Sequence, residues 1–204
     1  MAGIEQLQPG LYRWTARHPA WQPGADPGSP GDWGPEVGCV AFAIDRGIVV
    51  VDPQVPPDEA AFWAWMDTLV AAAHGRVWVL QTIRWHDRSR ARFVERYDAS
   101  CPPIMAAEID GMQPLPFREA DETMVWLDRP RALISGDRLI GAAGGGVRMC
   151  PQSWLAYLPN RLTIDRLRDL LMPLLDLPIE LILVSHGEPV LAGGHAQLRA
   201  ALAA

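Results

Sequence analysis

Four short segments of this chain carry side chains that could do acid–base or metal chemistry. Asp52 follows the apolar run VVV, Asp137 ends ALISGD, His186 lies in LILVSHGEP, and residues 82–89 read TIRWHDRS. Histidine and carboxylate groups ligate the metals of hydrolytic sites, and histidine also exchanges protons near neutral pH. Each segment follows a run of residues typical of a β-strand. We therefore look for function at the ends of these strands.

The elements that must position these residues begin with an alternation of strands and helices. Apolar and β-branched runs predict strands, and apolar residues at helical spacing predict helices. The expected elements are strands over 11–15, 39–44, 48–51 and 76–82 and helices over 58–73 and 89–97. Pro56 precedes the first helix and Gly75 follows it, as is typical of helix ends. This order indicates an α/β crossover.

The second half of the chain contains short strand-like runs and then helical patterns. The expected elements are strands over 104–107, 123–127, 132–135 and 179–184 and helices over 163–175 and 195–203. The segment 141–146, GAAGGG, is expected to be a flexible connector. It lacks the strand–GxGxxG–helix context of a dinucleotide-binding loop and the GK[ST] ending of a P-loop.

In order and spacing, the four strand-end segments resemble the motif series of the metallo-β-lactamase-like hydrolases. In that family the second motif is THxHxDH, a later one is a GD at a strand end, and the last is a GH or SHG turn. The resemblance covers about residues 38–190 of this chain. It implies an α/β (α+β) protein with a four-layer αββα sandwich, and we expect residues 1–204 to form a single domain.

The second motif departs from the family pattern. Ile83, Trp85 and Arg88 stand where the family has its three histidines, and none of these side chains can ligate a metal. The family's intermediate GHT segment is also absent. The resemblance therefore implies that the usual two-metal site does not form, and the expected cofactor is none. The motif residues that remain on matching positions are Asp87, Asp137 and His186.

One hypothesis assigns the electrostatic role of the missing metals to an arginine. Asp137 at a strand end needs a cationic or hydrogen-bonding partner if it is buried. Arg88 or Arg84 offers a guanidinium that can pair with Asp137 and with Asp87. The sequence thus predicts an arginine–carboxylate pair at this edge.

The same residues supply candidates for catalysis and binding. His186 and Asp87 are the candidate catalytic residues, with His186 either a general base or a hydrogen-bonded residue without a catalytic role. Trp85 occupies a ligand position of the motif and is expected to line an apolar pocket with Trp21 and Trp33. The candidates for binding a substrate or an anion are Arg84, Arg88 and Trp85.

The alternative is a site with one zinc or other divalent ion. Its ligands would be His86, Asp87, Asp137 and His186, which requires His86, at the family's variable position, to point inward. A water on such an ion would hydrolyse an ester, thioester or amide. Simpler roles also exist, because Asp52 can be structural and Asp87 can cap the helix that follows it.

A loop over residues 19–37 precedes the first motif and is rich in Pro, Gly and Trp. Loops longer than about 12–15 residues in a compact domain are usually functional or disordered. Trp21 and Trp33 would be costly to expose, so we expect this loop to pack back over a pocket.

The whole-chain composition narrows the class of protein. The 204 residues are 49% hydrophobic with a net charge of −6, and the arginines are scattered, which argues against a nucleic-acid partner. No signal segment and no apolar run of about 18 residues is found, so we expect a cytoplasmic protein without a membrane partner. Cys39, Cys101 and Cys150 are far apart and are expected to be free thiols.

Three classes of function are compatible with these observations. The first is a hydrolase with one metal or none. The second is a non-catalytic domain that binds a small molecule or an anion through Arg84 and Arg88. The third is a structural or partner-binding protein, such as a homodimer built on exposed Trp and Leu side chains. The fold by itself does not choose among them.

Overall fold

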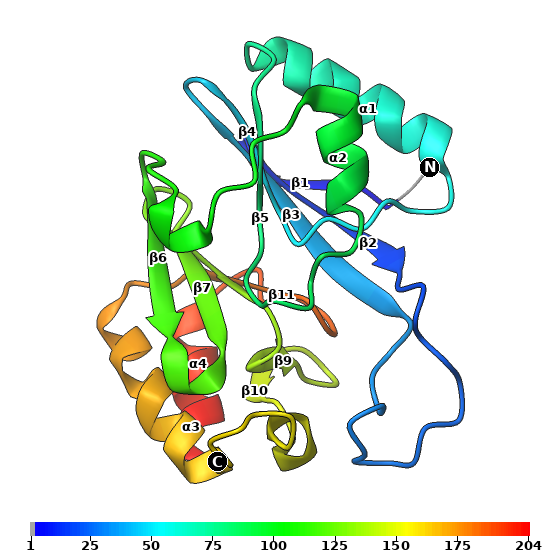
Figure 1. Ribbon diagram of the computed structural model, residues 1–204. Coiled ribbons are helices and arrows are strands. Elements are labelled where there is room, and N and C mark those ends of the chain that lie inside the picture. Colours follow the sequence, from blue (N-terminus) through cyan, green and yellow to red (C-terminus); the bar gives the residue numbers. More distant parts are fainter. Residues whose placement is uncertain (1–2) are drawn as a thin grey trace.

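The computed structural model describes residues 3–204, which form two large β-sheets and a small two-stranded one (Figure 1). The first sheet has the strand order β1-β2-β3-β4-β5 and the second has the order β11-β8-β7-β6. The strands of the first sheet are β1 (Glu5–Gln8), β2 (Leu11–Arg17), β3 (Glu36–Ile44), β4 (Gly47–Val51) and β5 (Val77–Leu80). Those of the second are β6 (Met112–Phe117), β7 (Glu122–Leu127), β8 (Ala132–Ser135) and β11 (Leu181–Val184).

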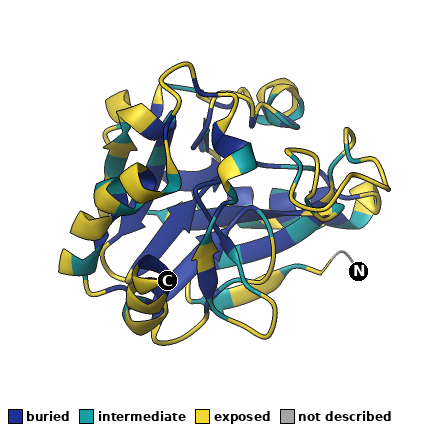
Figure 2. Ribbon diagram, turned by 90° about the horizontal axis from the view of Figure 1, so that it is seen from below, coloured by how far each residue is buried: buried dark blue, intermediate teal, exposed yellow. Residues whose placement is uncertain are grey.

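Helices cover the outer faces of both sheets. They are α1 (Glu59–Ala72), α2 (Arg90–Tyr97), α3 (Ile164–Leu171) and α4 (Gly194–Ala203). One buried cluster joins the first sheet to α1 and α2, and another joins the second sheet to α3 and α4. A third cluster combines residues of both sheets. Figure 2 shows the buried residues of the molecule in dark blue.

Side-chain alternation along the strands produces these layers. In β4, Ile48 and Val50 point to the helices, whereas Val49 and Val51 point to the other sheet. Successive side chains of a strand point to opposite faces, so a strand that is apolar at every position is buried on both. The αββα sandwich expected from the sequence is thus confirmed.

The remaining elements are short. β9 (Leu139–Gly141) and β10 (Val147–Met149) form an antiparallel hairpin. Four 3-10 helices are found in the described part of the chain, namely η1 (Ile104–Ala106), η2 (Arg118–Ala120), η3 (Gln152–Leu155) and η4 (Met172–Asp176). The segment 141–146, expected to be only a flexible connector, therefore contributes one strand residue and the turn of this hairpin.

Two other expectations about the second sheet are wrong. Residues 104–106 form a 3-10 turn after Pro102 and Pro103 instead of a strand. The strand β6 was not expected because it contains Pro114 and Pro116, which cannot donate to a ladder. It lies at the edge of its sheet, where proline is tolerated.

The parallel strand pairs bring the four motif segments to one edge of the sandwich. β4 and β5 are parallel in the first sheet, and β8 and β11 are parallel in the second. Asp52, residues 82–89, Asp137 and His186 follow the carboxyl ends of these four strands. The amide of Gly38 donates to the carbonyl of Ser185 at 2.7 Å and joins the two sheets at this edge.

Two glycines fasten the β9–β10 hairpin to the turn that carries His186. The amide of Gly141 donates to the carbonyl of His186 at 2.8 Å. A Cβ atom at Gly187 would lie 2.9 Å from the Gly141 backbone, and one at Gly141 would collide with the backbone of Glu188. Only glycine allows this approach of the two backbones.

The three cysteines are free thiols, as expected. Within residues 3–204, no helix combines the length and apolar character that a membrane crossing requires.

Candidate functional site

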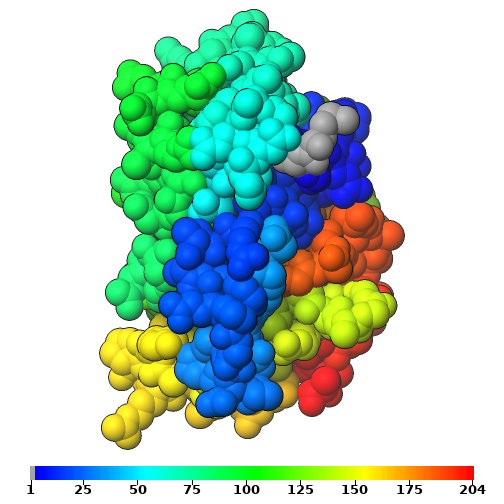
Figure 3. Space-filling model, turned by 90° about the vertical axis from the view of Figure 1, so that its right-hand side faces the viewer, coloured from blue at the N-terminus to red at the C-terminus, as the bar shows by residue number. Residues whose placement is uncertain are grey.

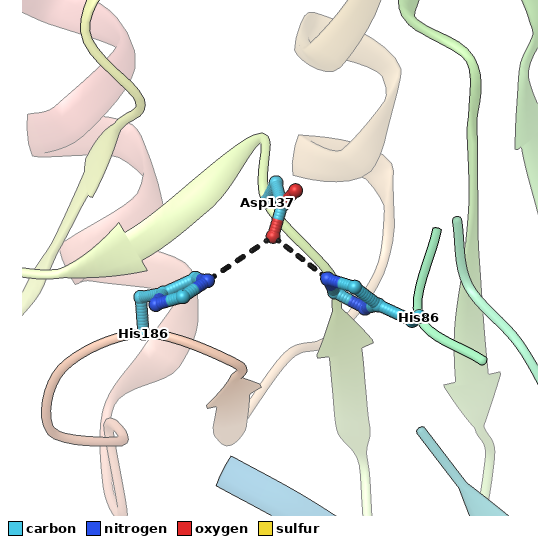
Figure 4. Close-up of side chains that lie close together, drawn as sticks. All are labelled: His86, Asp137 and His186. Carbon is cyan, nitrogen blue, oxygen red and sulfur yellow. Dashed lines mark ion pairs between the residues drawn. The ribbon is translucent and has the colours of Figure 1, made fainter. Parts of the chain in front are cut away.

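His86 lies between two buried carboxylates at the sandwich edge. Its Nδ1 is 2.9 Å from Oδ2 of Asp52, and its Nε2 is 3.1 Å from Oδ1 of Asp137 (Figure 4). Only 4% of the side chain is exposed. Burial and the nearby Arg88 guanidinium lower the pKa of His86, but Asp137 and Asp52 outweigh them and raise it to about 9.

Asp52, at the end of β4, is a structural partner of the loop over residues 82–89. The amide of Thr82 donates to Asp52 Oδ1 at 2.9 Å, and the Thr82 hydroxyl donates to Oδ2. Burial opposes ionisation of Asp52, but His86 holds its pKa below the ordinary value. A carboxylate that accepts from Nδ1–H fixes the tautomer of a histidine and directs Nε2 toward the pocket.

Asp137 is fixed at both its backbone and its side chain. The buried carboxylate of Glu122 accepts from the amides of Gly136, Asp137 and Arg138 at 2.8–3.0 Å, which holds the turn after β8. The indole Nε1 of Trp85 donates to Asp137 Oδ2 at 2.9 Å. Asp137 Oδ1 is therefore directed toward the two histidines.

His186 follows β11 and completes the cluster. Its Nε2 lies 3.4 Å from Asp137 Oδ1. The imidazole packs edge-on against Trp33 and Trp154, with ring centroids 5.3 and 5.1 Å apart. Burial lowers the pKa of His186 despite the carboxylate beside it.

Arg88 stands beside this cluster as a fixed cation. Its Nη1 donates to the carbonyls of Gly38 and Asp52 at 3.1 and 2.7 Å. Its Nη2 lies 3.5 Å from His86 Nε2. The guanidinium is thus anchored on one side and faces the histidine on the other.

The loop before β3 packs back over the site, as expected. Trp21 donates its indole N–H to the carbonyl of Trp33 at 2.8 Å. His18 lies 5.0 Å from the Trp33 ring, and its Nδ1 accepts from the amide of Ala20. Figure 3 shows this loop, in blue, on the surface of the molecule.

The cluster opens into a pocket of about 450 Å³. Most of its walls are aromatic or cationic. The lining residues are His18, Pro30, Trp33, Arg84, Trp85, His86, Arg88, Asp137, Trp154, Tyr157 and His186. This volume lies within the range of small-molecule sites.

The convergent atoms fit a single metal ion. Each of the residues His86, Asp137 and His186 offers one ligand atom, and these three atoms lie within 4.8 Å of one another. Neighbouring ligands around a tetrahedral zinc are about 3.3 Å apart when the bonds are about 2.0–2.1 Å long. The separations of 3.1 and 3.4 Å from Asp137 Oδ1 agree with this value.

Comparison with solved structures identifies the fold. A metallo-β-lactamase from Hirschia baltica is 10% identical over 99% of this chain and 96% of its own, with a TM-score of 0.61. A metallo-β-lactamase family protein from Thermus thermophilus is 15% identical over 97% and 80%, with a TM-score of 0.59. An enzyme from Erythrobacter litoralis, in its mono-zinc form, is 13% identical over 99% and 95%, with a TM-score of 0.60. This chain has the metallo-β-lactamase fold. No family model and no curated protein sequence matches it.

Within the metallo-β-lactamase fold, the loop after β5 presents a different residue from the one expected. The Asp87 side chain is 67% exposed and pairs with Arg90 at 3.3 Å, so its assignment as a catalytic or metal-ligating residue is wrong. His86 is the residue that points inward. The contact with Asp52 decides this, because His86 Nδ1 lies 2.9 Å from the buried Oδ2 of Asp52.

The arginine–carboxylate hypothesis is also wrong. Arg84 is 69% exposed and pairs with Asp121 at 2.8 Å, and Arg88 is bound to backbone carbonyls. Among the described residues, the ion-pair partners of Asp137 are His86 and His186. Trp85, Arg84 and Arg88 do line the pocket, and their role in binding remains a prediction.

Sequence reasoning missed several residues of the site. Glu122 is 3% exposed, and a glutamate at the start of an apolar strand is itself a signal, because a buried carboxylate requires several donors. His18 and Tyr157 lie in irregular segments where no pattern distinguishes them. Burial, with Arg88 next, lowers the pKa of His18 to about 4, so it is neutral at pH 7.

Proposed function

We propose that this chain is a hydrolase that holds one divalent metal ion at His86, Asp137 and His186 and cleaves an ester, thioester or amide. The observation that carries the proposal is the convergence of two imidazoles and one carboxylate, within 4.8 Å, on the floor of a small-molecule pocket. Three protein ligands with a further open position are typical of catalytic zinc sites. The similarity in fold to an enzyme in a mono-zinc form adds support.

A divalent ion in this position would supply Lewis acidity and would lower the pKa of a water toward neutrality. The chain's own residues would do the rest. Asp52 keeps the proton of His86 on Nδ1, which leaves Nε2 free to ligate. Arg88 Nη2, 3.5 Å from His86 Nε2, is placed to donate to an oxygen on which negative charge develops.

The pocket walls favour a small substrate with an apolar group. Trp33 and Trp154 pack on either side of the approach to His186, and the Tyr157 and Trp85 side chains are exposed at its margin. His18 accepts at Nδ1, so its proton is on Nε2, where it is available to a bound ligand.

The first test is metal content. Untagged protein purified without chelator is analysed by plasma mass spectrometry, and its melting temperature is measured with zinc, manganese, iron and EDTA. We expect about one equivalent of metal, lost with EDTA together with several degrees of melting temperature. Asp137→Ala should abolish uptake, whereas Asp87→Ala, a matched surface control, should retain it. Hydrolysis is then assayed on a panel of aryl esters, thioesters and anilides, and metal uptake without any turnover would contradict the hydrolase assignment.

A second candidate is a metal-free pocket that binds anions. It is favoured by one observation: His86, with its raised pKa of about 9, offsets one of the two negative charges of Asp52 and Asp137 when it is protonated. Arg88 then provides a further positive charge beside the pocket. Isothermal titration with small aromatic carboxylates in the presence of EDTA tests this function. Tight binding without metal, lost in Arg88→Gln, would favour it over the hydrolase.

A further inference from the structure

Trp85 joins the wall of the pocket to the metal-ligating cluster. Its ring is 40% exposed, which is high for a tryptophan, yet its indole N–H is engaged with Asp137 Oδ2 at 2.9 Å. The guanidinium carbons of Arg84 and Arg138 lie 5.3 and 5.7 Å from the ring centroid. Apolar burial therefore does not account for the position of this side chain, whereas its polar contacts do.

The two oxygens of Asp137 have different surroundings as a result. Oδ2 accepts from Trp85, whereas Oδ1 has, among residues 3–204, no nearby donor other than the two histidines that face it at 3.1 and 3.4 Å. The backbone of Asp137 is already held by Glu122. The hydrogen bond from Trp85 then fixes the remaining freedom, which is the rotation of the carboxylate.

We propose that Trp85 is a positioning residue that holds Asp137 by Oδ2, so that this carboxylate offers one oxygen, and the centre takes one ion. The inference rests on the metal-binding function proposed above and adds to it the residue that sets its stoichiometry. A carboxylate with both oxygens free can chelate one ion or bridge two. An indole N–H on one oxygen makes both arrangements less favourable, because it occupies a lone pair that a metal ion would need.

The charges near Trp85 point to the same stoichiometry. A second ion beside Asp137 Oδ2 would have to displace the indole N–H. It would also approach the guanidinium groups of Arg84 and Arg138, which flank the ring. The carboxylate of Asp87, two residues after Trp85, points to solvent and is unable to ligate a second ion.

The experiment compares Trp85→Phe with Trp154→Phe in the full-length protein. Both variants keep an aromatic ring in the pocket wall, but the Trp154 indole N–H has no hydrogen-bond partner in the described part of the chain, so its removal is a matched control. Zinc stoichiometry and affinity are measured by titration against a chromophoric chelator. We expect one equivalent in the native protein and in Trp154→Phe, and an affinity about 10- to 100-fold weaker in Trp85→Phe alone. Trp85→Gln, which restores an N–H donor at a similar reach, should recover much of the loss.

Two results would overturn the proposal: equal zinc affinity in Trp85→Phe and native protein, or two equivalents bound by the native protein. A native protein that takes up no zinc refutes the metal centre and the one-ion inference with it. A separate readout keeps the two failures distinguishable. The indole ¹⁵N–¹H resonance of Trp85 should shift in Asp137→Asn without added metal if the hydrogen bond exists. An unshifted resonance refutes the positioning contact itself.

Discussion

The two sheets deliver their parts of the site in different ways. The second sheet presents Asp137 on a tight turn whose backbone amides donate to the Glu122 carboxylate. The fixed backbone of this turn therefore decides where Asp137 lies. The first sheet presents His86 on the loop 82–89, where the side chain of Asp52 accepts from the Thr82 amide and contacts His86. In the turn, the backbone fixes the position of Asp137. In the loop, side-chain contacts decide that His86, and not a neighbouring polar residue, points inward.

This contrast explains why single substitutions should act differently on the two segments. In the loop, the consequence of a change depends on whether the side chain points inward. The turn is most sensitive to a residue outside it, Glu122 at the start of β7, because the Glu122 carboxylate holds the turn amides. Each of the following predictions tests one side of this comparison.

The largest effect is expected within the loop, between neighbouring residues. His86→Ala leaves the buried carboxylates of Asp52 and Asp137 without their shared partner and should lower the free energy of unfolding by about 3–5 kcal/mol. Asp87→Ala, one residue away and exposed, should change it by less than about 0.5 kcal/mol. Urea unfolding followed by circular dichroism measures both. Equal midpoints for the two variants would show that the loop does not present His86.

The charge on His86 should also make the metal-free protein sensitive to pH. Although burial and Arg88 lower the pKa, Asp137 and Asp52 raise it to about 9 from an ordinary 6.5. A raised pKa gives stability that is complete below about pH 6.5 and is lost as the pH rises through about 9. The loss is on the order of 3 kcal/mol.

Urea unfolding in EDTA between pH 6 and pH 10 measures this dependence. The His86→Ala variant serves as the control, because it should lack this part of the slope. Saturating zinc should remove the decline, since the ion takes the place of the proton. A native protein whose stability is flat over this range would mean that His86 is neutral between its carboxylates.

The turn should respond to Glu122→Gln. The amide nitrogen of glutamine has no lone pair to accept from the amides of Gly136, Asp137 and Arg138, so at least one buried donor loses its partner. We expect a loss of about 1.5–3 kcal/mol in chemical unfolding. Glu119→Gln, at an exposed pair with Arg166, is the control and should cost less than about 1 kcal/mol. If the two variants unfold alike, Glu122 does not hold the turn.

The smallest effect is expected at Arg84, on the exposed side of the loop. Its pair with Asp121 is open to solvent, so Arg84→Ala should change stability by less than about 1 kcal/mol. Thermal melting at low and high salt is the measurement. A loss of several degrees that persists at high salt would show that the cation over the Trp85 ring supports the loop.

The sequence allowed prediction of the fold and of the turn residues more readily than of the loop. Asp137 and His186 were expected because the GD and SHG segments resemble family motifs, and each residue follows its strand by two positions, which leaves little choice of position. His86 and Asp87 are adjacent and both polar, and the choice between them depends on contacts with Asp52, 34 residues away from His86. The edge strand β6 was obscured by its prolines, and Glu122 by its distance in sequence from the turn that it holds.

The contact between Gly141 and Gly187 has a consequence for motion in the native state. Because the two backbones touch and the Gly141 amide is bonded to the carbonyl of His186, the β9–β10 hairpin is unable to open while the His186 turn stays in place. Amide hydrogens of Gly141 and of the hairpin should therefore exchange with solvent deuterium together with those of the turn, as one cooperative unit. Any ligand that holds His186 would then slow exchange in a hairpin that it does not touch.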